Sequence, residues 1–488
     1  MNKVKFKKLL LSVTIFIGFC IVFFVPRYFA HLQYDALEDE ILSIDFNSSF
    51  LLKEFLLAPD LVHPPLWYML MDYPTSILGL DHGIFYYRLI QVLSLFSIII
   101  FTLFYFYKKL PNNFLFTFFA LFLSNVYLVH LTSQHRMYAM ILGISIFYSF
   151  YWYHLIKNGE DKSFKHFIVL GLIAAIGFFI NYSIIWLIPI WPLSYLFYKR
   201  NSHSLKRLIV FSSTFLVLIS WFIPRFLWNT LMTSSIDNEY YLDFNITNFL
   251  KLFADFFGII PTNDQTSNNL LVGPYFLLLF CLFFFSKKRN EDSYQKKMII
   301  FTIISFLLFL FFGIFNDFKL LVPRTSITIV IAFYILIADL LGSFKYSKNI
   351  VYLLIFFQLT QFTIYFANDY KTLTSYDLFN YRRHPMYYFS NFNFLENSCL
   401  ITMPVWNEFS AQYYIGDKVK ILSSDKLWKD LDFDQPTCNK IYVLDQTSVD
   451  REDVALQIRQ IENYGFSFVN LISHQNQTLY ILNYSEER

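Results

Sequence analysis

Charged residues are scarce in this chain. They make up 15% of its 488 residues, whereas about 25% is usual for soluble domains. Glycine occurs only 13 times, and no glycine-rich loop of the kind that cradles nucleotide phosphates is present. The shortage of charge excludes an ordinary soluble protein, and the absence of the loop leaves no sequence sign of nucleotide binding. The net charge of +3 is small, and we expect no nucleic-acid partner.

Hydrophobic residues form 56% of the chain and occur in long runs. Most runs approach the roughly 20 residues with which a helix crosses a bilayer. The sequence therefore predicts a polytopic α-helical membrane protein with about 11 transmembrane helices. Two short runs, 167–180 and 184–197, indicate a tight helical hairpin or a re-entrant pair with a turn shielded by protein. The expected spans are 9–25, 85–107, 114–131, 137–156, 167–180, 184–197, 208–227, 270–285, 298–315, 320–341 and 350–366.

Lysine and arginine are dense in every second connection between these runs. Twenty cations lie in the dense segments and eight in the others, up to residue 366. Because cytoplasmic loops carry the excess of Lys and Arg, we expect a cytoplasmic N-terminus. The composition, rich in Lys, Phe, Tyr and Asn, is typical of a bacterial protein, so the expected location is the bacterial inner (plasma) membrane. The first run is expected to stay as an anchor, because "VPRYFAHLQ" offers no clear cleavage site. The dense segments are 3–8, 108–109, 157–165, 199–207, 287–297 and 345–348.

The chain changes character after residue 366. Five strand-like segments ("CLITMPV", "VKILSS", "KIYVLD", "FSFVNLI", "TLYILNY") alternate with two helix-like ones ("WNEFSAQYYIG", "DREDVALQIRQIENYG"). The sequence thus predicts a transmembrane domain at 1–366, an aromatic membrane-proximal connection at 367–394 and a small extracytoplasmic α/β domain at 395–488. A disulfide between Cys399 and Cys438 is allowed in that compartment but not required.

The first external loop, 27–84, carries a group of acids. "YDALEDE" contains Asp35, Glu38, Asp39 and Glu40. A segment at 47–58 follows, with helix caps and an apolar face, and it is expected to lie in the membrane interface.

Next comes "DLVHPPLWYML", in which two prolines follow Asp60 and His63. The prolines would stop the interfacial helix and fix His63 at headgroup depth, facing the loop that carries Asp39. Residues 66–70 would then pack back onto the membrane domain.

Together these motifs resemble a known family. An acidic pair after the first span (Asp39, Glu40), D-x-x-H-P-P-L from Asp60 to Leu66 and an Arg-Leu opening of the next helix at Arg88 are similar to the GT-C superfamily of membrane glycosyltransferases. The similarity is greatest to the bacterial transferases related to protein O-mannosyltransferases, aminoarabinose transferases of lipid A and galacturonosyl transferases of lipopolysaccharide core.

Two further segments extend the resemblance to about residue 366. "SQHRMYA" (133–139) is similar to the family's S-Q-x-x-R-x-Y-A element, although it is one residue shorter and has His135 where many members carry Glu. "VPRT" (322–325) is similar to the family's P-R-Y, with Thr325 in place of Tyr. The tail is similar to the soluble appendages of some members.

The resemblance implies an inverting glycosyltransferase of the cell envelope, acting in lipopolysaccharide or protein glycosylation. It would move a hexosyl or pentosyl group from a polyprenyl-phosphate donor to a lipid, glycan or protein acceptor. Asp39 would be the catalytic base, with Glu40 beside it. Both could also hold a divalent metal, because carboxylates suit hard cations, but nothing in the sequence requires a cofactor. The implied substrate-binding residues are Asp60, His63, Arg88, Arg136, Tyr138 and Arg324.

Plainer interpretations remain open for these residues. Arg136 and Arg324 stand at helix starts, where the helix dipole disfavours a cation, so a bound anion would account for them. For the others, the plainer roles are solvated loop charge (Asp39, Glu40), the end of the interfacial helix (Asp60), a hydrogen-bonded histidine beside Pro64 (His63), a side chain that extends to the interface (Arg88) and an interface aromatic (Tyr138).

Two rival functions can be weighed against the transferase. A transporter or flippase of lipid-linked sugars would place ionisable residues at mid-membrane and show paired repeats. Here charges cluster at span ends, with Asp339 as the main exception, and no repeat is visible. A polysaccharide polymerase or ligase would concentrate its residues in a large late loop, yet 229–269 is poor in cations.

Overall fold

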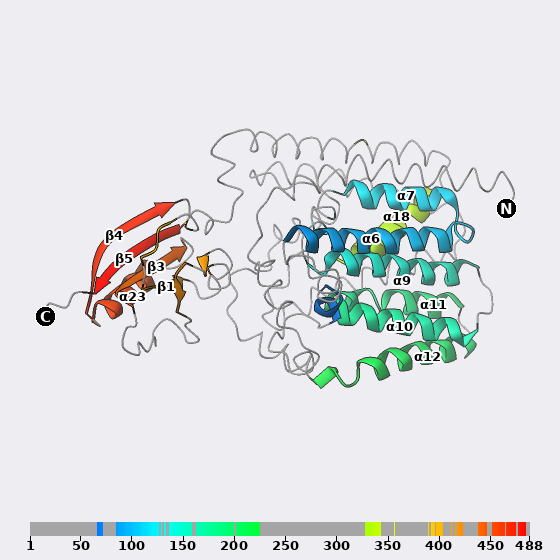
Figure 1. Cartoon of the computed structure of the whole chain (residues 1–488). Coiled ribbons are helices and arrows are strands. Elements are labelled where there is room, and N and C mark those ends of the chain that lie inside the picture. The colour runs from blue at the N-terminus through cyan, green and yellow to red at the C-terminus, as the bar shows by residue number, and fades with distance from the viewer. Residues whose placement is uncertain are drawn as a thin grey trace. The chain divides into compact units, whose positions relative to one another are not determined.

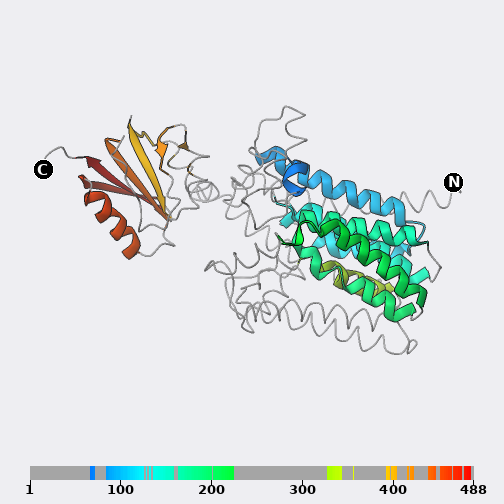
Figure 2. The same ribbon diagram turned by 90° about the horizontal axis from the view of Figure 1, so that it is seen from below.

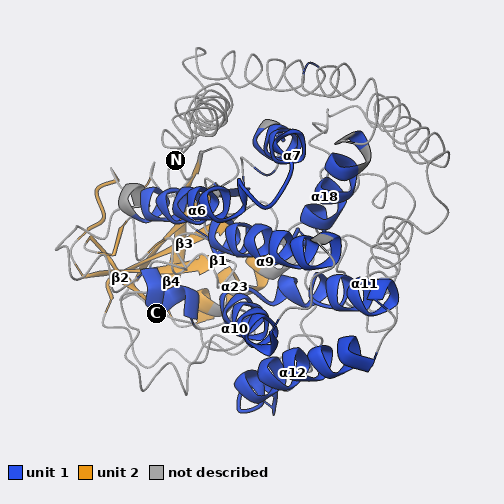
Figure 3. Cartoon of the chain, turned by 90° about the vertical axis from the view of Figure 1, so that its right-hand side faces the viewer, with its two compact units in different colours: residues 1–31, 50–368 blue, residues 32–49, 369–488 orange. Residues whose placement is uncertain are grey.

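The computed structural model describes a helical part and a part built around a sheet (Figure 1). In the helical part, the structure describes residues 66–71, 84–125, 128, 131–132, 136–158, 163–199, 202–224, 327–342 and 356. In the other part it describes residues 389, 392–395, 397–403, 411, 415–416, 418–422, 438–446, 451–463, 465–474 and 477–484. The chain divides into two compact units, which Figure 3 colours separately: residues 1–31 with 50–368, the helical unit, and residues 32–49 with 369–488, the sheet unit.

Apolar helices make up the helical unit. Three stretches are long and apolar enough to cross a membrane: Tyr87–Phe106, Tyr138–Lys157 and Ser202–Ile219. The predicted spans 9–25, 270–285 and 298–315 lie outside the described residues, as does 350–366 except for Phe356. The described helices are α6 (Ile84–Phe106), α7 (Asn112–Ser124), α9 (Tyr138–Asn158), α10 (Phe164–Ile180), α11 (Ile190–Lys199), α12 (Ser202–Ile219) and α18 (Ile329–Gly342).

Helix α9 lies at the centre of these helices. It packs against α6, α10, α11 and α18 (Figure 3), and 83% of its apolar stretch is buried, against 39% for α6 and 33% for α12. The outward faces of α6 and α12 carry Phe101, Phe104 and Val217. A helix that is apolar all round is typical of a protein core or a membrane span, so α9 forms the core while α6 and α12 present surfaces suited to lipid.

Aromatic side chains fill the space around α9. The Trp152 ring contacts Phe167 of α10, Tyr195 of α11 and Phe211 of α12. On the opposite side, Phe150 meets aromatic rings of α6 and α7. Such rings bury large apolar areas and prefer tilted or edge-to-face contacts, which explains how a chain this rich in Phe packs its helices.

The two short runs form a hairpin with a shielded turn. Helix α10 ends at Ile180, and a 3₁₀ turn, η2 (Tyr182–Trp186), leads towards α11. The Asn181 side chain accepts a hydrogen bond from the Ser183 backbone N–H at 2.8 Å, and both residues are buried. A Cβ at Gly177 would collide with Ile184, so glycine permits the turn to fold back this closely. Protein shields the turn, as predicted from the sequence.

The sheet unit is an α/β structure, as predicted. Its strand order is β2-β1-β3-β5-β4. β1 is parallel to β2 and β3, and β5 is antiparallel to β3 and β4. The five predicted strand segments are confirmed as β1 (Ser398–Met403), β2 (Lys420–Ile421), β3 (Lys440–Gln446), β4 (Phe466–His474) and β5 (Gln477–Tyr484).

Apolar cores lie on both faces of this sheet. Helix α23 (Arg451–Asn463) connects β3 to β4 and covers one face (Figure 2), where Val454 and Ile461 pack against Ile441 and Val443. Ala411 and Ile415 belong to the core on the other face, and they are the helical residues described within the predicted helix at 406–416.

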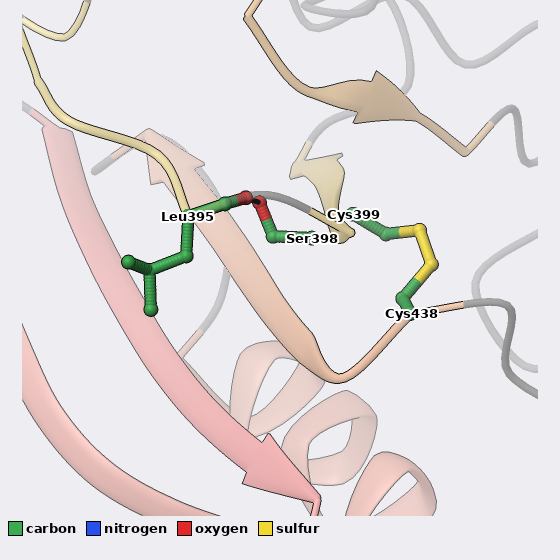
Figure 4. The surroundings of a disulfide bond; sticks show 4 residues. All are labelled: Leu395, Ser398, Cys399 and Cys438. Carbon is green, nitrogen blue, oxygen red and sulfur yellow. Dashed lines mark hydrogen bonds between the residues drawn. A yellow bond between two sulfur atoms is a disulfide. The ribbon is translucent and has the colours of Figure 1, made fainter.

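A disulfide links two segments of the sheet unit (Figure 4). Cys399 in β1 is bonded to Cys438, two residues before β3, and the Cα atoms are 5.7 Å apart. The Ser398 hydroxyl donates a hydrogen bond to the Leu395 carbonyl at 2.6 Å just before this point. The sequence allowed this bridge without requiring it, and the pairing of β1 beside β3 is what brings the two cysteines together.

Candidate functional site

Three of the predicted site residues, Arg88, Arg136 and Tyr138, belong to the part of the chain that the structure describes. The remaining predicted site residues, Asp39, Glu40, Asp60, His63 and Arg324, lie outside the described residues. The candidate site is therefore built from the three described residues and from the groups that pack around them.

Arg88 lies near the start of α6 and is completely buried. A guanidinium that extended to the membrane interface would be exposed, so this placement argues against that interpretation. Removing an ion from water is costly unless polar or charged groups surround it. Arg88 is therefore held inside the protein at the end of an apolar helix, where charge is expensive to keep.

Arg136 and Tyr138 stand at the start of α9. Tyr138 is its first residue, and the exposed fractions are 5% for Arg136 and 6% for Tyr138. An aromatic belt residue would present its ring to the interface, whereas this ring faces protein. The "SQHRMYA" segment thus directs an arginine and a tyrosine into the protein at the point where α9 begins.

Gln91 connects three of the sequence motifs. It lies on α6, one turn after Arg88, and is fully buried. The amide orientation that gives both ends a partner lets Oε1 accept from Trp67 Nε1 at 2.5 Å, while Nε2 donates to the Arg136 backbone oxygen at 3.2 Å. In the opposite orientation Nε2 lies 2.9 Å from Met71 Sδ. Either way, Gln91 holds residues 66–71 against α6.

The contacts of the Gln91 side chain bring separate parts of the sequence together. Residues 66–71 follow the two prolines of "DLVHPPLWYML", and Trp67, Tyr68 and Met71 are buried. Residues 66–70 therefore pack onto the helices, as the sequence analysis predicted. The D-x-x-H-P-P-L motif leads directly into a segment that contacts Gln91 of α6, and Gln91 in turn contacts the Arg136 backbone at the start of α9.

Two arginines accordingly stand where two adjacent helices begin. α6 and α9 pack together, and the Gln91–Arg136 contact joins their starts. Each helix start carries partial positive charge from its aligned peptide dipoles, and the two guanidiniums add to it. An anion with several oxygens is the natural partner of such a place, because helix N-termini and arginines both bind phosphate.

The loop cations lie at the opposite end of the helices. In the described helical unit, Lys108, Lys109, Lys157, Lys165, Lys199 and Lys206 flank the α6–α7, α9–α10 and α11–α12 connections. Arg88 and Arg136 are at the other ends of α6 and α9. This is the alternation expected from the sequence, now seen as two ends of one group of packed helices.

A hydrogen bond that the sequence analysis missed lies at the start of α18. The Thr328 hydroxyl donates to the Ser183 backbone oxygen at 2.6 Å and is fully buried. This bond fixes the η2 turn against Thr328, which lies four residues after Arg324 and directly before α18. Gln91 and Trp67 were also missed. The sequence marks Gln91 only as a polar residue in an apolar run, and Trp67 only as an amphipathic residue directly after a motif.

No group of three or more His, Cys, Asp or Glu side chains that could hold a metal ion occurs among the described residues. Asp39 and Glu40, the pair suggested for a divalent cation, lie outside them. What the described geometry offers is two buried arginines, Arg88 and Arg136, at the joined starts of α6 and α9.

Comparisons with known proteins give a likeness of fold. Neither a protein-family model nor a curated protein sequence matches this chain. Among solved structures, it is similar to ArnT from Cupriavidus metallidurans bound to undecaprenyl phosphate, at 11% sequence identity and a TM-score of 0.52. The match covers 97% of this chain and 98% of that one. The chain therefore has the fold of ArnT, an aminoarabinose transferase of the GT-C group that the sequence motifs resemble.

Proposed function

We propose that the chain is an inverting glycosyltransferase. It transfers a sugar from a polyprenyl-phosphate donor to a lipid, glycan or protein acceptor on the extracytoplasmic face of the membrane. The observation that carries this proposal is the placement of two buried arginines, Arg88 and Arg136, at the joined starts of α6 and α9. The fold likeness to a protein bound to undecaprenyl phosphate supports the same ligand class.

In the proposed reaction, one displacement at the anomeric carbon does all the chemistry. The acceptor oxygen bonds to this carbon while the bond from the carbon to the phosphate oxygen breaks, with an oxocarbenium-like transition state. Asp39 takes the acceptor proton as general base, with Glu40 beside it. Polyprenyl phosphate leaves with an added negative charge, which Arg88 and Arg136 stabilise.

The remaining predicted residues complete the substrate site in this proposal. Asp60 and His63 come just before residues 66–71, which Gln91 ties to α6, so both are assigned to sugar or phosphate binding. Arg324 precedes the Thr328–Ser183 contact and is assigned to the phosphate. Tyr138 follows Arg136 and is assigned to the donor. A divalent metal at Asp39 and Glu40 would add positive charge near the leaving group.

The proposed topology has about 11 spans, a cytoplasmic N-terminus and an extracytoplasmic C-terminal domain. Its support is the cation distribution in the described helical unit, where the lysine-rich connections share one end and Arg88 and Arg136 the other. Because Lys and Arg mark cytoplasmic loops, the arginine end faces outward. In this topology the acidic first loop is extracytoplasmic, as expected from the sequence.

Lipid analysis and a transfer assay would test this function together. Lipid extracted from the purified full chain is expected to contain a polyprenyl phosphate by mass spectrometry. Arg136→Gln should reduce the retained lipid at least tenfold. Asp39→Asn should keep the lipid and abolish transfer from a synthetic polyprenyl-phosphate sugar. Full activity of Asp39→Asn would remove the assigned base, and retention of bulk phospholipid alone by the wild-type chain would contradict the proposed donor.

The flippase alternative finds less support in the described residues. Asp339, the acid that stood out in an apolar run, is paired with Lys157 at the lysine-rich end of the helices. A structural ion pair accounts for it without a transport site. Movement of a fluorescent polyprenyl-phosphate sugar across the membrane of vesicles that contain the Asp39→Asn protein would favour the flippase function.

A further inference from the structure

Three polar side chains form a row across one end of the sheet. Asp445 on β3 is in register with Thr478 on β5, and Thr478 is in register with Ser473 on β4. Residues directly opposite each other in antiparallel strands point to the same face. Asp445 is two residues after Val443 and four after Ile441, so the three side chains lie on the same face of β3. Ile441 and Val443 pack against α23, so the row lies on the α23 side. The hydroxyls of Thr478 and Ser473 are 3.1 Å apart.

Asp445 is the unusual member of this row. Its exposed fraction is 7%, and Oδ1 makes no hydrogen bond with any residue that the structure describes. Burial raises the pKa of its carboxyl from 3.8 to about 6. Buried polar groups in native proteins are nearly always hydrogen-bonded, and an exception calls for a specific explanation. An absent hydrogen-bond donor is the simplest one.

An apolar, partly aromatic strip adjoins the polar row on the same face. Tyr480 and Leu471 form the next registered pair, and Phe468 pairs with Leu482 one row further. Phe468 is 43% exposed and Leu471 is 49% exposed, and the rings of Phe468 and Tyr480 are 6.4 Å apart. Helix α23 therefore leaves part of this face uncovered beside Asp445.

The topology also favours a ligand at this end of the sheet. β3 and β4 are parallel, and both end here. In the strand order β2-β1-β3-β5-β4, the connection that leaves β1 leads to β2 on one side, and the connection that leaves β3 leads to β4 on the other side. The direction of the connections therefore changes between β1 and β3. Ligands of open α/β sheets bind outside the carboxyl ends of the strands at such a point. Asp445 stands at that end of β3.

We propose that the Asp445 face (Asp445, Thr478 and Ser473 with Phe468, Leu471 and Tyr480) binds a carbohydrate. Sugar hydroxyls donate to a carboxylate and exchange hydrogen bonds with Ser and Thr hydroxyls, and the C–H faces of a sugar ring pack on aromatic rings. An anion would be repelled by the carboxylate. A cation site is disfavoured because no three His, Cys, Asp or Glu side chains gather among the described residues. This proposal stands apart from the transfer reaction.

The full chain in phospholipid nanodiscs is suited to the test, since sugar-headed detergents would compete for the site. The probes are glucose, galactose, mannose and N-acetylglucosamine, each as monosaccharide and short oligomer, observed by saturation-transfer NMR. At least one probe is expected to bind. Asp445→Asn and Phe468→Ala should each weaken its binding at least tenfold, whereas Asn483→Ala, on the opposite face of β5, should not change it.

The variants separate this site from the transfer site. Arg136→Gln is expected to retain the sugar signal, and Asp445→Asn is expected to retain lipid and keep the thermal unfolding temperature of the wild type or raise it. The proposal is overturned if none of the probes binds, if Asp445→Asn binds as tightly as wild type, or if Arg136→Gln alone abolishes binding. A calcium-dependent unfolding temperature that Asp445→Asn removes would also overturn it, in favour of a cation.

Discussion

Lys157 on α9 and Asp339 on α18 form an ion pair with 2.8 Å between Nζ and Oδ1. The Tyr153 hydroxyl donates to the same carboxylate oxygen, and Lys157 also donates to the Tyr153 hydroxyl at 2.9 Å. The Asp339 side chain is 5% exposed and that of Lys157 is 36% exposed. This network ties two helices, far apart in the sequence, at the end opposite Arg88 and Arg136.

Asp339→Ala is expected to destabilise the helical unit by about 2 kcal/mol. Removal of one partner from a buried pair leaves the other uncompensated, and the partial exposure of Lys157 reduces the cost. Thermal unfolding in detergent, followed by circular dichroism, would measure this. Lys206→Ala, which removes an exposed lysine from α12, serves as the control with no change. Equal unfolding temperatures for the two variants would show that the pair contributes nothing.

Gln91→Leu is expected to lower the rate of sugar transfer about 10- to 100-fold while the protein stays folded. The variant keeps the side-chain volume but removes the link between Trp67 and the Arg136 backbone, and small misplacements of binding groups are costly in catalysis. Thr102→Val on the same helix loses only a hydroxyl bonded to its own helix backbone and should remain active. A fully active Gln91→Leu enzyme would exclude a positioning role for Gln91.

Arg136→Lys is expected to weaken donor binding at least tenfold, although the substitution keeps the positive charge. Arginine binds phosphate through a planar pair of donors, which an ammonium cannot reproduce. The measurement is the KM for the polyprenyl-phosphate sugar together with the amount of co-purified lipid. Arg207→Lys is the matched control, because Arg207 donates to the Tyr195 hydroxyl at the lysine-rich end. Parallel losses in both variants would point to general destabilisation.

Replacement of Cys399 and Cys438 by serine is expected to destabilise the sheet unit by roughly 2–4 kcal/mol. The bridge spans 39 residues, and without it that segment gains freedom in the unfolded state. Hydrogen exchange of β1 and β3 peptides, with and without reductant, would show the loss. The same peptides would keep full protection if the bridge does not form in the native protein.

Asp445 should make the sheet unit less stable as pH rises from about 4 to 6. Its carboxyl has a pKa of about 6 when folded, against 3.8 for a free carboxyl, so the folded state binds more protons in this interval and loses stability as they leave. A rise in pKa from 3.8 to about 6 corresponds to about 3 kcal/mol, which solvent screening reduces to an expected loss on the order of 1–2 kcal/mol. Most of the loss occurs by about pH 6, and the rest by about pH 7. Urea unfolding monitored at β3 and β5 would measure it. Asp445→Asn should remove this component, and an identical pH profile in that variant would contradict it.

Local patterns in the sequence predicted much of the architecture. Apolar runs predicted α6, α9 and α10 to within three residues at each end, because a bilayer demands a continuous apolar length from each helix. α12 begins six residues before the start of its predicted run at 208–227 and ends eight residues before the end of that run. α7 and α18 are shorter than their predicted runs, and the run at 184–197 became η2 and α11. These differences arise because α-helix boundaries depend on caps and turns as well as on hydropathy.

The candidate site was only partly accessible to the same reasoning. Arg88, Arg136 and Tyr138 could be selected because they match motifs at helix starts. Gln91 and Thr328 could not, since nothing in a one-dimensional pattern shows which polar residue of an apolar helix meets a partner from another segment. The row of Asp445, Thr478 and Ser473 depends in the same way on strand register.

The sequence by itself determined that the chain is a membrane protein, that its cations alternate between span ends and that a strand-rich unit follows. Those properties depend on composition and on spacing along the chain. The tertiary structure decided that Arg88 is buried, that Gln91 joins residues 66–71 to the start of α9 and that Cys399 meets Cys438. Each is a contact between residues distant in sequence, and only the packing of helices and the pairing of strands brings such residues within bonding distance.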